Sequence, residues 1–325
     1  MSFAVNRDIE NKNALNIYRL EHLALQMHIP SEEIIEILEN IKSHYSIMEE
    51  KQYNPDGTLK KIRIVYKATL ALKKILKAIN KYLLRKIKLP EYIHGSRTRH
   101  SIQSNAESHV GKYYVFSLDI KNFFPSISAN NVYNLFKRLK CSHEVAKILE
   151  KICTADDHLP QGYNTSSYIA NLIILPAAMR IHALCKKQGL NASFYVDDIT
   201  ISGNKDPEKL FPTINRIITE CGFKLNMEKK VCKKAMEQKK VTGIIVNKKM
   251  NIEKAQYRKV RAIINRCKKH GPASLLGRIQ KSNGDKIETL TGLKNHLRGK
   301  LTHFAQINRE KLYSLEIAFN EINWT

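Results

Sequence analysis

The chain has 325 residues, of which 43% are hydrophobic and 26% charged, enough apolar material for one large core or two to three subdomains. Lysine and arginine total 55 against 30 aspartates and glutamates, which gives a net charge of +25. So large an excess favours a polyanionic partner, most often nucleic acid. We expect no membrane span, because no run of about 18 apolar residues is evident, and no signal peptide, because the N-terminus lacks an apolar core.

Six cysteines and twelve histidines are scattered along the chain without metal-ligand spacing. No CxxC pair occurs, and several cysteines fall on apolar helical faces, which argues against a disulfide framework or a zinc finger. The same cysteine usage favours a reducing compartment. We therefore expect a cytoplasmic protein without a membrane partner.

The N-terminal part of the chain predicts a helix, a hairpin and a basic helix in that order. Ser31 follows a proline and is the expected N-cap of the first helix. Residues 45–66 indicate two strands around Asn-Pro-Asp-Gly at 54–57, a sequence typical of a turn. Residues 68–88 carry an apolar stripe at helical spacing and a run of lysines and arginines. A charge run is usually a solvated face, but its single sign favours a nucleic-acid track.

The central and C-terminal parts predict a mixture of strands and helices. We expect a polar loop over 94–111 and then a buried strand over 113–118 that ends at Asp119. Ser128 is placed to cap the helix that follows, and another helix is expected to begin at Ser142. The remaining predicted elements are a long helix over 165–187, a helix over 208–221, strands over 223–226 and 241–246, and helices from Lys254 to the end.

An acidic pair stands out at residues 195–198, which read Tyr-Val-Asp-Asp. The flanking residues are β-branched and aromatic, which predicts two short strands joined at the pair. Adjacent carboxylates such as Asp197 and Asp198 repel, and holding both costs free energy unless a cation neutralises them. In a chain of net charge +25 this favours a metal site. A solvated turn is the alternative, because aspartate is common in turns.

A third carboxylate, Asp119, ends the buried strand that comes before this turn in the chain. If the strands are neighbours in one sheet, Asp119 converges on Asp197 and Asp198. Three carboxylates make a hard-oxygen site suited to Mg²⁺, which keeps water and substrate phosphate as its other ligands. Two such ions roughly 4 Å apart hold an attacking and a leaving oxygen in line. The sequence therefore predicts a phosphoryl-transfer site with two Mg²⁺ ions.

The order of the motifs resembles that of a reverse transcriptase, and closely that of the bacterial retron class. The stretches that carry the resemblance are 117–127 around Asp119, Leu-Pro-Gln-Gly-Tyr at 159–163, the acidic turn at 195–198, Gly-Phe-Lys-Leu-Asn at 222–226 followed by Lys229, and the basic residues Lys61 and Arg63. Two matches narrow the class, namely Asn-Ala-Glu-Ser-His at 105–109 and Val-Thr-Gly at 241–243. Residues 298–304 also resemble a retron thumb helix, although Lys300 stands where an aromatic residue is frequent. Several motifs in the same order identify a family far more specifically than a single tetrapeptide does.

The resemblance implies catalytic and nucleotide-binding roles for the matched residues. Asp119, Asp197 and Asp198 would be catalytic, and together with Ile120 they would form the ligand set for Mg²⁺. The residues implied in nucleotide binding are Lys61, Arg63, Phe124, Gln161, Gly162 and Lys229. Phe124 takes the steric-gate position that favours deoxynucleotides, and core packing is its alternative. Gln161 and Gly162 would shape the pocket, since close backbone approach tolerates no Cβ at 162, and a generic turn is their alternative.

The two retron-specific motifs are assigned to RNA or primer binding. Their residues are Asn105, His109, Val241, Thr242 and Gly243. Asn105 and His109 have the equal alternative of fixing a loop by hydrogen bonds, because both side chains serve either purpose readily. Residues 241–243 have the alternatives of a hairpin that supports the primer end and a plain tight turn.

The fold implied by the resemblance is an α+β right-hand polymerase with an antiparallel palm sheet. We expect an N-terminal helical extension over 1–44 and fingers over 45–112, with part of 128–190 interleaved. The palm would cover 113–247 and a helical thumb 248–325.

Retron enzymes bind a structured noncoding RNA (msr-msd) from their own operon and prime from a 2′-hydroxyl of an internal guanosine. They copy part of that RNA into branched multicopy single-stranded DNA (msDNA). The resemblance therefore implies this RNA, its msDNA product, dNTPs and a retron effector protein of antiphage defence as partners. The alternatives are a reverse transcriptase of the intron, diversity-generating or abortive-infection type, against which the matches at 105–109 and 241–243 argue, and a scaffold that mainly sequesters an effector.

Overall fold

The computed structural model describes residues 14–53, 58–279, 281 and 285–324. In this part of the chain helices surround antiparallel sheets, so the protein is of the α+β class. The central sheet has the strand order β4-β5-β3-β6 and consists of β3 (Tyr114–Asp119), β4 (Asn191–Tyr195), β5 (Asp198–Gly203) and β6 (Val231–Lys233). Two further sheets pair β1 (Tyr45–Tyr53) with β2 (Leu59–Ala68) and β7 (Lys240–Val241) with β8 (Ile244–Ile245).

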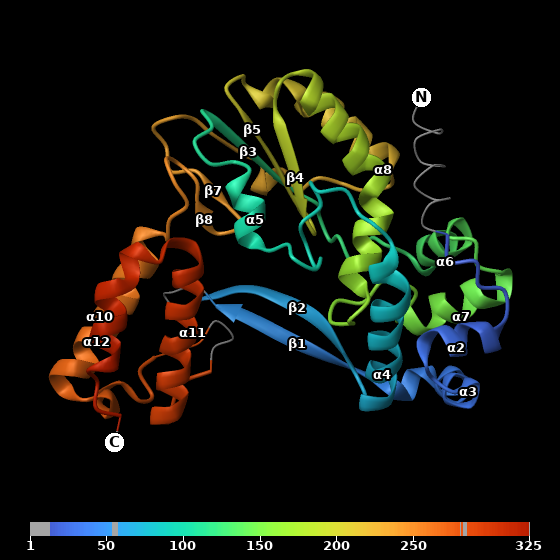
Figure 1. Cartoon of the computed structure of the whole chain (residues 1–325), viewed down its shortest axis with the longest axis horizontal. Helices are drawn as coiled ribbons and strands as arrows, with labels where there is room; N and C mark the ends of the chain where they lie inside the picture. Colours follow the sequence, from blue (N-terminus) through green and yellow to red (C-terminus); the bar gives the residue numbers. More distant parts are fainter. Residues whose placement is uncertain (1–13, 54–57, 280, 282–284, 325) are drawn as a thin grey trace.

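The central sheet is held by the β-branched and aromatic side chains of its inner strands, which suit a pleated, buried surface. Phe116, Phe194 and Ile201 are fully or almost fully buried in one hydrophobic cluster with the neighbouring helices. Figure 1 shows α8 alongside the sheet, and it contacts both β4 and α9. The helices of this cluster include α6 (Ala129–Arg138), α7 (His143–Cys153), α8 (Ser166–Lys187) and α9 (Phe211–Glu220). Ser128 caps α6, as predicted, and Ser142, where a helix was expected to begin, is the N-cap of α7.

Helix α8 is the one described helix that is long and apolar enough to cross a membrane, with a window of mean hydropathy 1.5. The expectation from the sequence that no such run exists was wrong on this point. Of that window, 61% is buried inside the protein, and Ile169, Ala177 and Ile181 have no exposed surface. This burial is typical of a core helix packed on a sheet.

The predicted hairpin is confirmed as the antiparallel pair β1–β2, which runs from Tyr45 opposite Ala68 to Tyr53 opposite Leu59, with a register shift between Gln52 and Tyr53. Its predicted turn at 54–57 lies outside the described residues. Figure 1 shows the pair as a long ribbon apart from the central sheet. The base of the ribbon is anchored because the hydroxyls of Tyr45 and Tyr66 both donate to the carboxylate of Asp156, at 3.0 and 2.8 Å.

The N-terminal helices differ from the prediction in their boundaries. Helix α2 (Leu20–Met27) was not predicted, and α3 (Ser31–Glu39) has Pro30 at its N-cap, so Ser31 is its first residue and not its cap. The basic helix is shorter than expected: α4 (Leu70–Ala78) passes into a π-helical turn, η2 (Ile79–Leu83), and then a 3₁₀ turn, η3 (Leu84–Lys86). Side-chain periodicity alone did not reveal this change of helical pitch.

Two other segments correct the sequence expectations. The polar loop predicted over 94–111 contains a short helix, α5 (Ile102–Glu107), which Ser101 and Ser104 stabilise with a capping box. The strand predicted over 223–226 is reduced to an isolated bridge between Leu225 and Ile120, and β6 follows it instead. Both segments are too short for periodicity to define.

The C-terminal helices form a second hydrophobic cluster. Figure 1 shows α10 (Lys254–His270), α11 (Leu290–Asn308) and α12 (Tyr313–Asn320) gathered at one end of the molecule. Leu297 and Phe304 of α11 are fully buried there. The predicted helical character beyond Lys254 is confirmed for these elements. The remaining short helices are η1 (Ile41–His44), η4 (Pro207–Leu210), η5 (Met227–Lys229), η6 (Pro272–Leu275) and η7 (Glu310–Leu312).

Candidate active site

The three predicted catalytic aspartates meet at one end of the central sheet. Asp119 is the last residue of β3 and pairs directly with Asp198, the first residue of β5. The amide of Ile120 donates to the carbonyl of Asp197 at 3.0 Å, which fixes the turn against the end of β3. Asp119 is 7% exposed, and Asp197 and Asp198 are half-buried. The sheet register therefore brings together three carboxylates that are distant in the sequence.

The turn that carries Asp197 has a strained backbone. Tyr195 pairs with Asp198, so Val196 and Asp197 form a two-residue hairpin turn. Val196 has φ of +58°, a conformation that a β-branched residue rarely adopts. Such a conformation persists where the surroundings determine it strongly, and it is concentrated at functional sites.

Residues 92–95 lie against this turn and hold it. The amide of Phe194 donates to Tyr92 and the amide of His94 donates back to Phe194, both at 2.8 Å. Gly95 then packs on Val196 so closely that an added Cβ would lie 2.7 Å from the Val196 nitrogen. The buried side chain of Asn171 donates to the carbonyl of Gly95 at 2.7 Å. The sequence analysis missed these contacts, because they join segments that are distant in the chain and no local pattern marks them.

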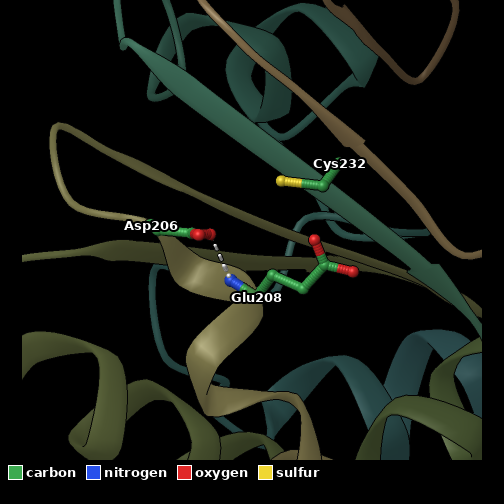
Figure 2. A group of neighbouring side chains, drawn as sticks. All are labelled: Asp206, Glu208 and Cys232. Atoms are coloured by element: carbon green, nitrogen blue, oxygen red, sulfur yellow. Dashed lines mark hydrogen bonds between the residues drawn. The ribbon is translucent and has the colours of Figure 1, made fainter.

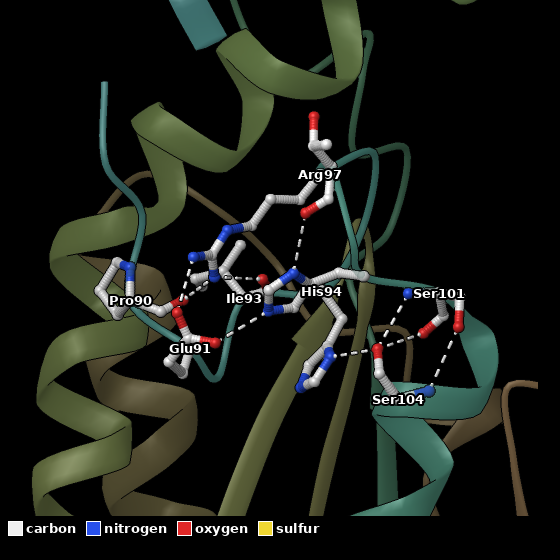
Figure 3. A network of polar contacts seen from close by, with 9 residues as sticks. Pro90, Glu91, Ile93, His94, Arg97, Ser101 and Ser104 are labelled. Atoms are coloured by element: carbon white, nitrogen blue, oxygen red, sulfur yellow. Dashed lines mark hydrogen bonds and ion pairs between the residues drawn. The ribbon is translucent and has the colours of Figure 1, made fainter. Parts of the chain in front are cut away.

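The loop behind Gly95 is fixed by a polar network (Figure 3). Arg97 donates to the carbonyl of Pro90 at 2.7 Å and pairs with Glu91 at 2.9 Å. His94 and Ser104 hydrogen-bond at 3.0 Å, which ties the loop to the first turn of α5. The loop is thus connected to both β4 and α5.

Lys229 neutralises part of the acidic cluster. The chain at 224–226 runs beside the end of β3, where the amide of Asn226 donates to the Asp119 carbonyl at 2.7 Å. This pairing brings the Lys229 Nζ to 2.6 Å from Asp119 Oδ1. The ammonium of Lys229 therefore lies directly on one of the three carboxylates.

The environment raises the pKa of the two turn aspartates. Burial is the main reason that the pKa of Asp198 rises to about 6, and the charges of Asp197 and Asp119 add to it. Burial also raises the pKa of Asp197, and Asp119 adds to the effect while Lys229 and Arg63 oppose it. A cation that neutralises such buried, mutually repelling carboxylates stabilises them. This donor set is hard oxygen, so it fits a divalent cation such as Mg²⁺.

A cavity of about 340 Å³ opens beside the two turn aspartates. Phe124, Gln161 and Gly162 all line it together with Asp197 and Asp198. Phe124 is half-buried, whereas its neighbour Phe123 is 3% exposed and packs against Phe223 in the core with the two rings tilted. Three of the residues predicted for nucleotide binding therefore share one hollow with the acidic turn.

The two basic residues of the hairpin are placed differently from each other. Arg63 is half-buried on β2, and its charge lowers the pKa of Asp197, so its guanidinium acts on the acidic turn. Lys61 is exposed and does not line the cavity. Because β2 leads to Tyr66, whose amide donates to the Gln161 carbonyl at 2.8 Å, the hairpin is attached to the cavity wall.

The retron-specific motifs are mainly inside the protein. His109 is fully buried, and its two ring nitrogens lie 2.7 Å from the hydroxyls of Ser202 and Ser193, so it joins β5 and β4. Burial lowers the pKa of His109 to about 3, which keeps the ring neutral. Asn105 is 1% exposed, and neither polar atom of its side chain has a partner among the described residues.

The Val-Thr-Gly motif forms the tight turn of the β7–β8 hairpin, with positive φ at Thr242 and Gly243. The Thr242 hydroxyl donates to the carbonyl of Ile102 at 3.1 Å, so the hairpin docks on α5. Val241 is 1% exposed and Gly243 is exposed. These positions support a packing role for the buried members, and contact with RNA stays a prediction.

A second group of candidate ligands lies beside β6 of the same sheet (Figure 2), and both of its carboxylates have protein partners. Within the described residues, Asp206, Glu208 and Cys232 are the only three candidate ligands whose atoms all lie within 4.8 Å of one another. Asp206 accepts from the Glu208 amide at 2.9 Å, and Glu208 pairs with Lys230 at 2.8 Å. Burial raises the pKa of the Cys232 thiol to about 11, which makes it a poor ligand. The ligand atoms of Asp119, Asp197 and Asp198 do not form so close a group.

The acidic sheet end and the adjoining cavity fit a nucleotide-polymerising enzyme, and the sequence comparison identifies the family of the chain. Residues 49–246 match the family model described as reverse transcriptase (RNA-dependent DNA polymerase). The chain belongs to the reverse transcriptase family and is an RNA-directed DNA polymerase.

The curated relatives are reverse transcriptases of retrons. The chain is 30% identical to the retron Se72 reverse transcriptase of Salmonella heidelberg, over 95% of this chain and 81% of that protein. It is 31% identical to the retron Ec86 reverse transcriptase of Escherichia coli, over 64% of this chain and 66% of that protein. The Mx65 enzyme of Myxococcus xanthus is 25% identical over 77% of this chain and 59% of its own length. The resemblance to retron reverse transcriptases inferred from the motifs is confirmed.

Proposed function

We propose that this reverse transcriptase binds a structured noncoding RNA from its own operon, primes from an internal 2′-hydroxyl and makes branched msDNA. The observation that carries the polymerase part is the meeting of Asp119, Asp197 and Asp198 beside a cavity lined by Phe124 and Gln161. The similarity to a retron enzyme over 95% of the chain supports the retron part.

We assign the parts of a right-hand polymerase to the described elements. The β1–β2 hairpin and α4 belong to the fingers over 45–112, with part of 128–190 interleaved. The central sheet belongs to the palm over 113–247, and α10 to α12 belong to the thumb over 248–325. The second hydrophobic cluster holds the buried residues of the C-terminal helices and also Val115, Val241 and Ile244, which supports a thumb packed directly on the palm. Residues 14–44 of the N-terminal extension pack on the fingers side through α2 and α3.

Asp119, Asp197 and Asp198 would hold Mg²⁺, with Ile120 contributing only backbone at the end of β3. A pair of Mg²⁺ ions bound there supplies positive charge to the attacking hydroxyl and the leaving pyrophosphate. The raised pKa values of the turn aspartates support cation binding, because a divalent charge relieves the repulsion that raises them. Lys229 would leave Asp119 for the triphosphate when a nucleotide enters. Arg63 and Lys61 would face the triphosphate from the hairpin.

The nucleotide would occupy the cavity of about 340 Å³ between the turn and the Gln161–Gly162 stretch. The Phe124 ring forms part of its wall, where it would clash with the 2′-hydroxyl of a ribonucleotide. Gly162 is needed because a Cβ there would lie 2.4 Å from the carbonyl oxygen of Tyr66. The close approach of β2 at this point supports a pocket-shaping role over a generic turn.

Purification of the chain with its native operon RNA tests the proposal directly. Nucleic acid that co-purifies should be sensitive in part to RNase and in part to DNase, and a debranching enzyme should separate the two. Asp197→Asn should abolish the DNA component and leave the RNA component, because the change removes a charge at the metal site without loss of volume. DNA of normal length from Asp197→Asn would contradict the catalytic assignment, and unbranched DNA from the wild type would contradict 2′-priming.

We also place the protein–RNA–DNA particle in the cytoplasm, where it would restrain a retron effector in antiphage defence. If catalysis serves only to make the ligand of such an effector, preformed msDNA supplied with the Asp197→Asn protein should restore protection. Failure of preformed product to restore protection would show that ongoing synthesis is required.

A further inference from the structure

The fingers hairpin has little buried surface of its own to hold it in place. Among the residues of β1 and β2, all of which the structure describes, Tyr66 is the only buried one. A two-stranded hairpin without a buried face is marginally stable in water. The orientation of this hairpin therefore depends on the side chains that hold its base.

One carboxylate binds both strands of the hairpin. Tyr45 is opposite Ala68 and Tyr66 is opposite Ile47, so the two tyrosines are diagonal neighbours on the same face of the ribbon. Their ring centres lie 5.8 Å apart, and both hydroxyls donate to Asp156, at 3.0 and 2.8 Å. Hydrogen bonds to a charged acceptor are stronger than those between neutral groups. We call Tyr45, Tyr66 and Asp156 the hairpin clamp.

The carboxylate of the hairpin clamp is carried by a well-defined two-residue turn. Ala155 and His158 exchange both backbone hydrogen bonds, at 3.0 and 3.1 Å, so Asp156 and Asp157 form the turn between them. Both aspartates have positive φ, +47° and +60°, as in a type I′ turn, where aspartate is favoured. The His158 ring donates to the Asp156 carbonyl at 2.8 Å and packs edge to face on Tyr66 at 5.5 Å. These contacts fix the direction of the Asp156 side chain.

The turn is connected to two walls of the nucleotide cavity. The amide of Leu159, which follows the turn, donates to the carbonyl of Ile127 at 2.8 Å. Ile127 comes three residues after Phe124, and Leu159 comes two residues before Gln161. Both Phe124 and Gln161 line the cavity. The hairpin clamp therefore joins the base of the hairpin to the segments that form the nucleotide site.

The hairpin in turn brings Arg63 to the acidic turn. Arg63 is half-buried and its charge lowers the pKa of Asp197. It lies three residues before Tyr66, so it is on the opposite face of β2 and about 10 Å further along the strand. A small tilt of the hairpin about its base therefore displaces Arg63 by more than it displaces the clamp.

We propose that Asp156 is a positioning residue for nucleotide addition. Through the hydroxyls of Tyr45 and Tyr66 it holds the fingers hairpin at the angle at which Arg63 reaches the triphosphate. Asp156 does not line the nucleotide cavity, so it acts through Arg63. The inference rests on the triphosphate contact of Arg63 in the proposed function, and it does not depend on 2′-priming or on an effector.

Single-nucleotide extension of a DNA primer on an RNA template tests the proposal. Tyr66→Phe removes only a hydroxyl and should raise KM for the dNTP about tenfold with kcat within about twofold, as expected for the loss of a hydrogen bond to a charged group. Asp156→Gly removes both bonds, tolerates the positive φ and should raise KM at least as much. An unchanged KM in these two variants would overturn the proposal, even if kcat fell, because a merely structural role reduces only the amount of active enzyme.

Two variants of the same turn serve as rescue and control. Asp156→Asn retains an acceptor oxygen and adds an amide that can donate to the second hydroxyl, so its KM should stay within about threefold of the wild type. Asp157→Gly changes the other position of positive φ, whose carboxylate accepts from neither tyrosine, and should leave KM unchanged. A rise in Asp157→Gly equal to that in Asp156→Gly would overturn the role of the clamp carboxylate.

A double-mutant cycle tests whether the clamp acts through Arg63. Arg63→Gln should raise KM by itself, and Tyr66→Phe should add little in that background. Increases that multiply would overturn the proposal. A normal KM for Arg63→Gln alone would refute the triphosphate contact and this inference with it. A raised KM for Arg63→Gln with normal values for the clamp variants would refute the inference alone.

Amide hydrogen exchange gives a readout that requires no activity. In Asp156→Gly the peptides of β1 and β2 should exchange at least about threefold faster than in the wild type, and those of β3 and β5 should not change. Unchanged protection of the hairpin would overturn the proposal, because the clamp would then not hold it.

Discussion

Replacement of Asp198 by asparagine should make the metal-free protein more stable while abolishing DNA synthesis. Burial and the neighbouring carboxylates move the pKa of Asp198 from 3.8 to about 6. That change corresponds to about 3 kcal/mol, at roughly 1.4 kcal/mol per tenfold change in a proton equilibrium. Asparagine has the same shape without the charge. Because its amide must find a partner in a half-buried site, we expect a net gain of about 1–3 kcal/mol at pH 7.5.

The stability of the wild-type protein should depend on pH through the titration of Asp198. The folded protein keeps a proton on Asp198 up to about pH 6, whereas the unfolded chain releases it near 3.8. The folded state therefore binds more protons between these values, and wild-type stability falls as pH rises through that window. The Asp198→Asn advantage should be absent below about pH 4 and complete above about pH 6.

Urea unfolding in EDTA at several pH values measures the difference. Asp157→Asn, which changes an exposed carboxylate outside the acidic sheet end, should stay within about 0.5 kcal/mol of the wild type. Added Mg²⁺ should stabilise the wild type and leave Asp198→Asn unchanged. An Asp198→Asn protein that is equally or less stable than the wild type at pH 7.5 in EDTA would show that the carboxylates are not mutually destabilised.

Three further changes test other parts of the site. Phe124→Ala should admit ribonucleotides in primer extension, and unchanged discrimination would remove the steric-gate role. Gly95→Ala should lower the free energy of unfolding by about 1–3 kcal/mol and kcat roughly a hundredfold, because the new methyl group meets the backbone of the strained turn. The control is Gly299→Ala, which should retain full activity because nothing lies within 4 Å of the added methyl group. Lys229→Met should move the acid limb of the kcat/KM profile to higher pH, since Lys229 lowers the pKa of Asp197; an unmoved limb would contradict that charge effect.

The acidic sheet end could be predicted because its signals are local. A buried apolar strand ends at Asp119, and β-rich flanks surround Asp197 and Asp198, so strand boundaries and acidic residues coincide. The positions of Phe124 and Gln161 beside the acidic turn could be predicted from the motifs that contain them. The hydrophobic pattern fixes which face of each strand is buried, and this in turn fixes the register that places Asp119 opposite Asp198.

The residues that hold this sheet end in place could not be predicted, because their contacts join segments that are distant in the chain. Nothing local marks Gly95 as the residue that packs on Val196, or Asn171 as the donor to its carbonyl. Helix α5 has only six residues, and its sequence is polar enough to resemble a loop. His109 likewise joins two strands of the sheet by hydrogen bonds to two serine hydroxyls, and the spacing of these residues in the sequence does not predict the contacts.

The Gln161–Gly162 stretch shows how one short motif sets the position of the whole hairpin. Gly162 has φ of +122°, and its missing side chain leaves room for the carbonyl of Tyr66 on β2. The same tyrosine donates its amide to the Gln161 carbonyl and its hydroxyl to Asp156. Any side chain at 162 would therefore displace β2 and, with it, the Arg63 charge that acts on Asp197. A turn alone would need only the backbone conformation, so the close contact with β2 is the stronger reason for glycine here.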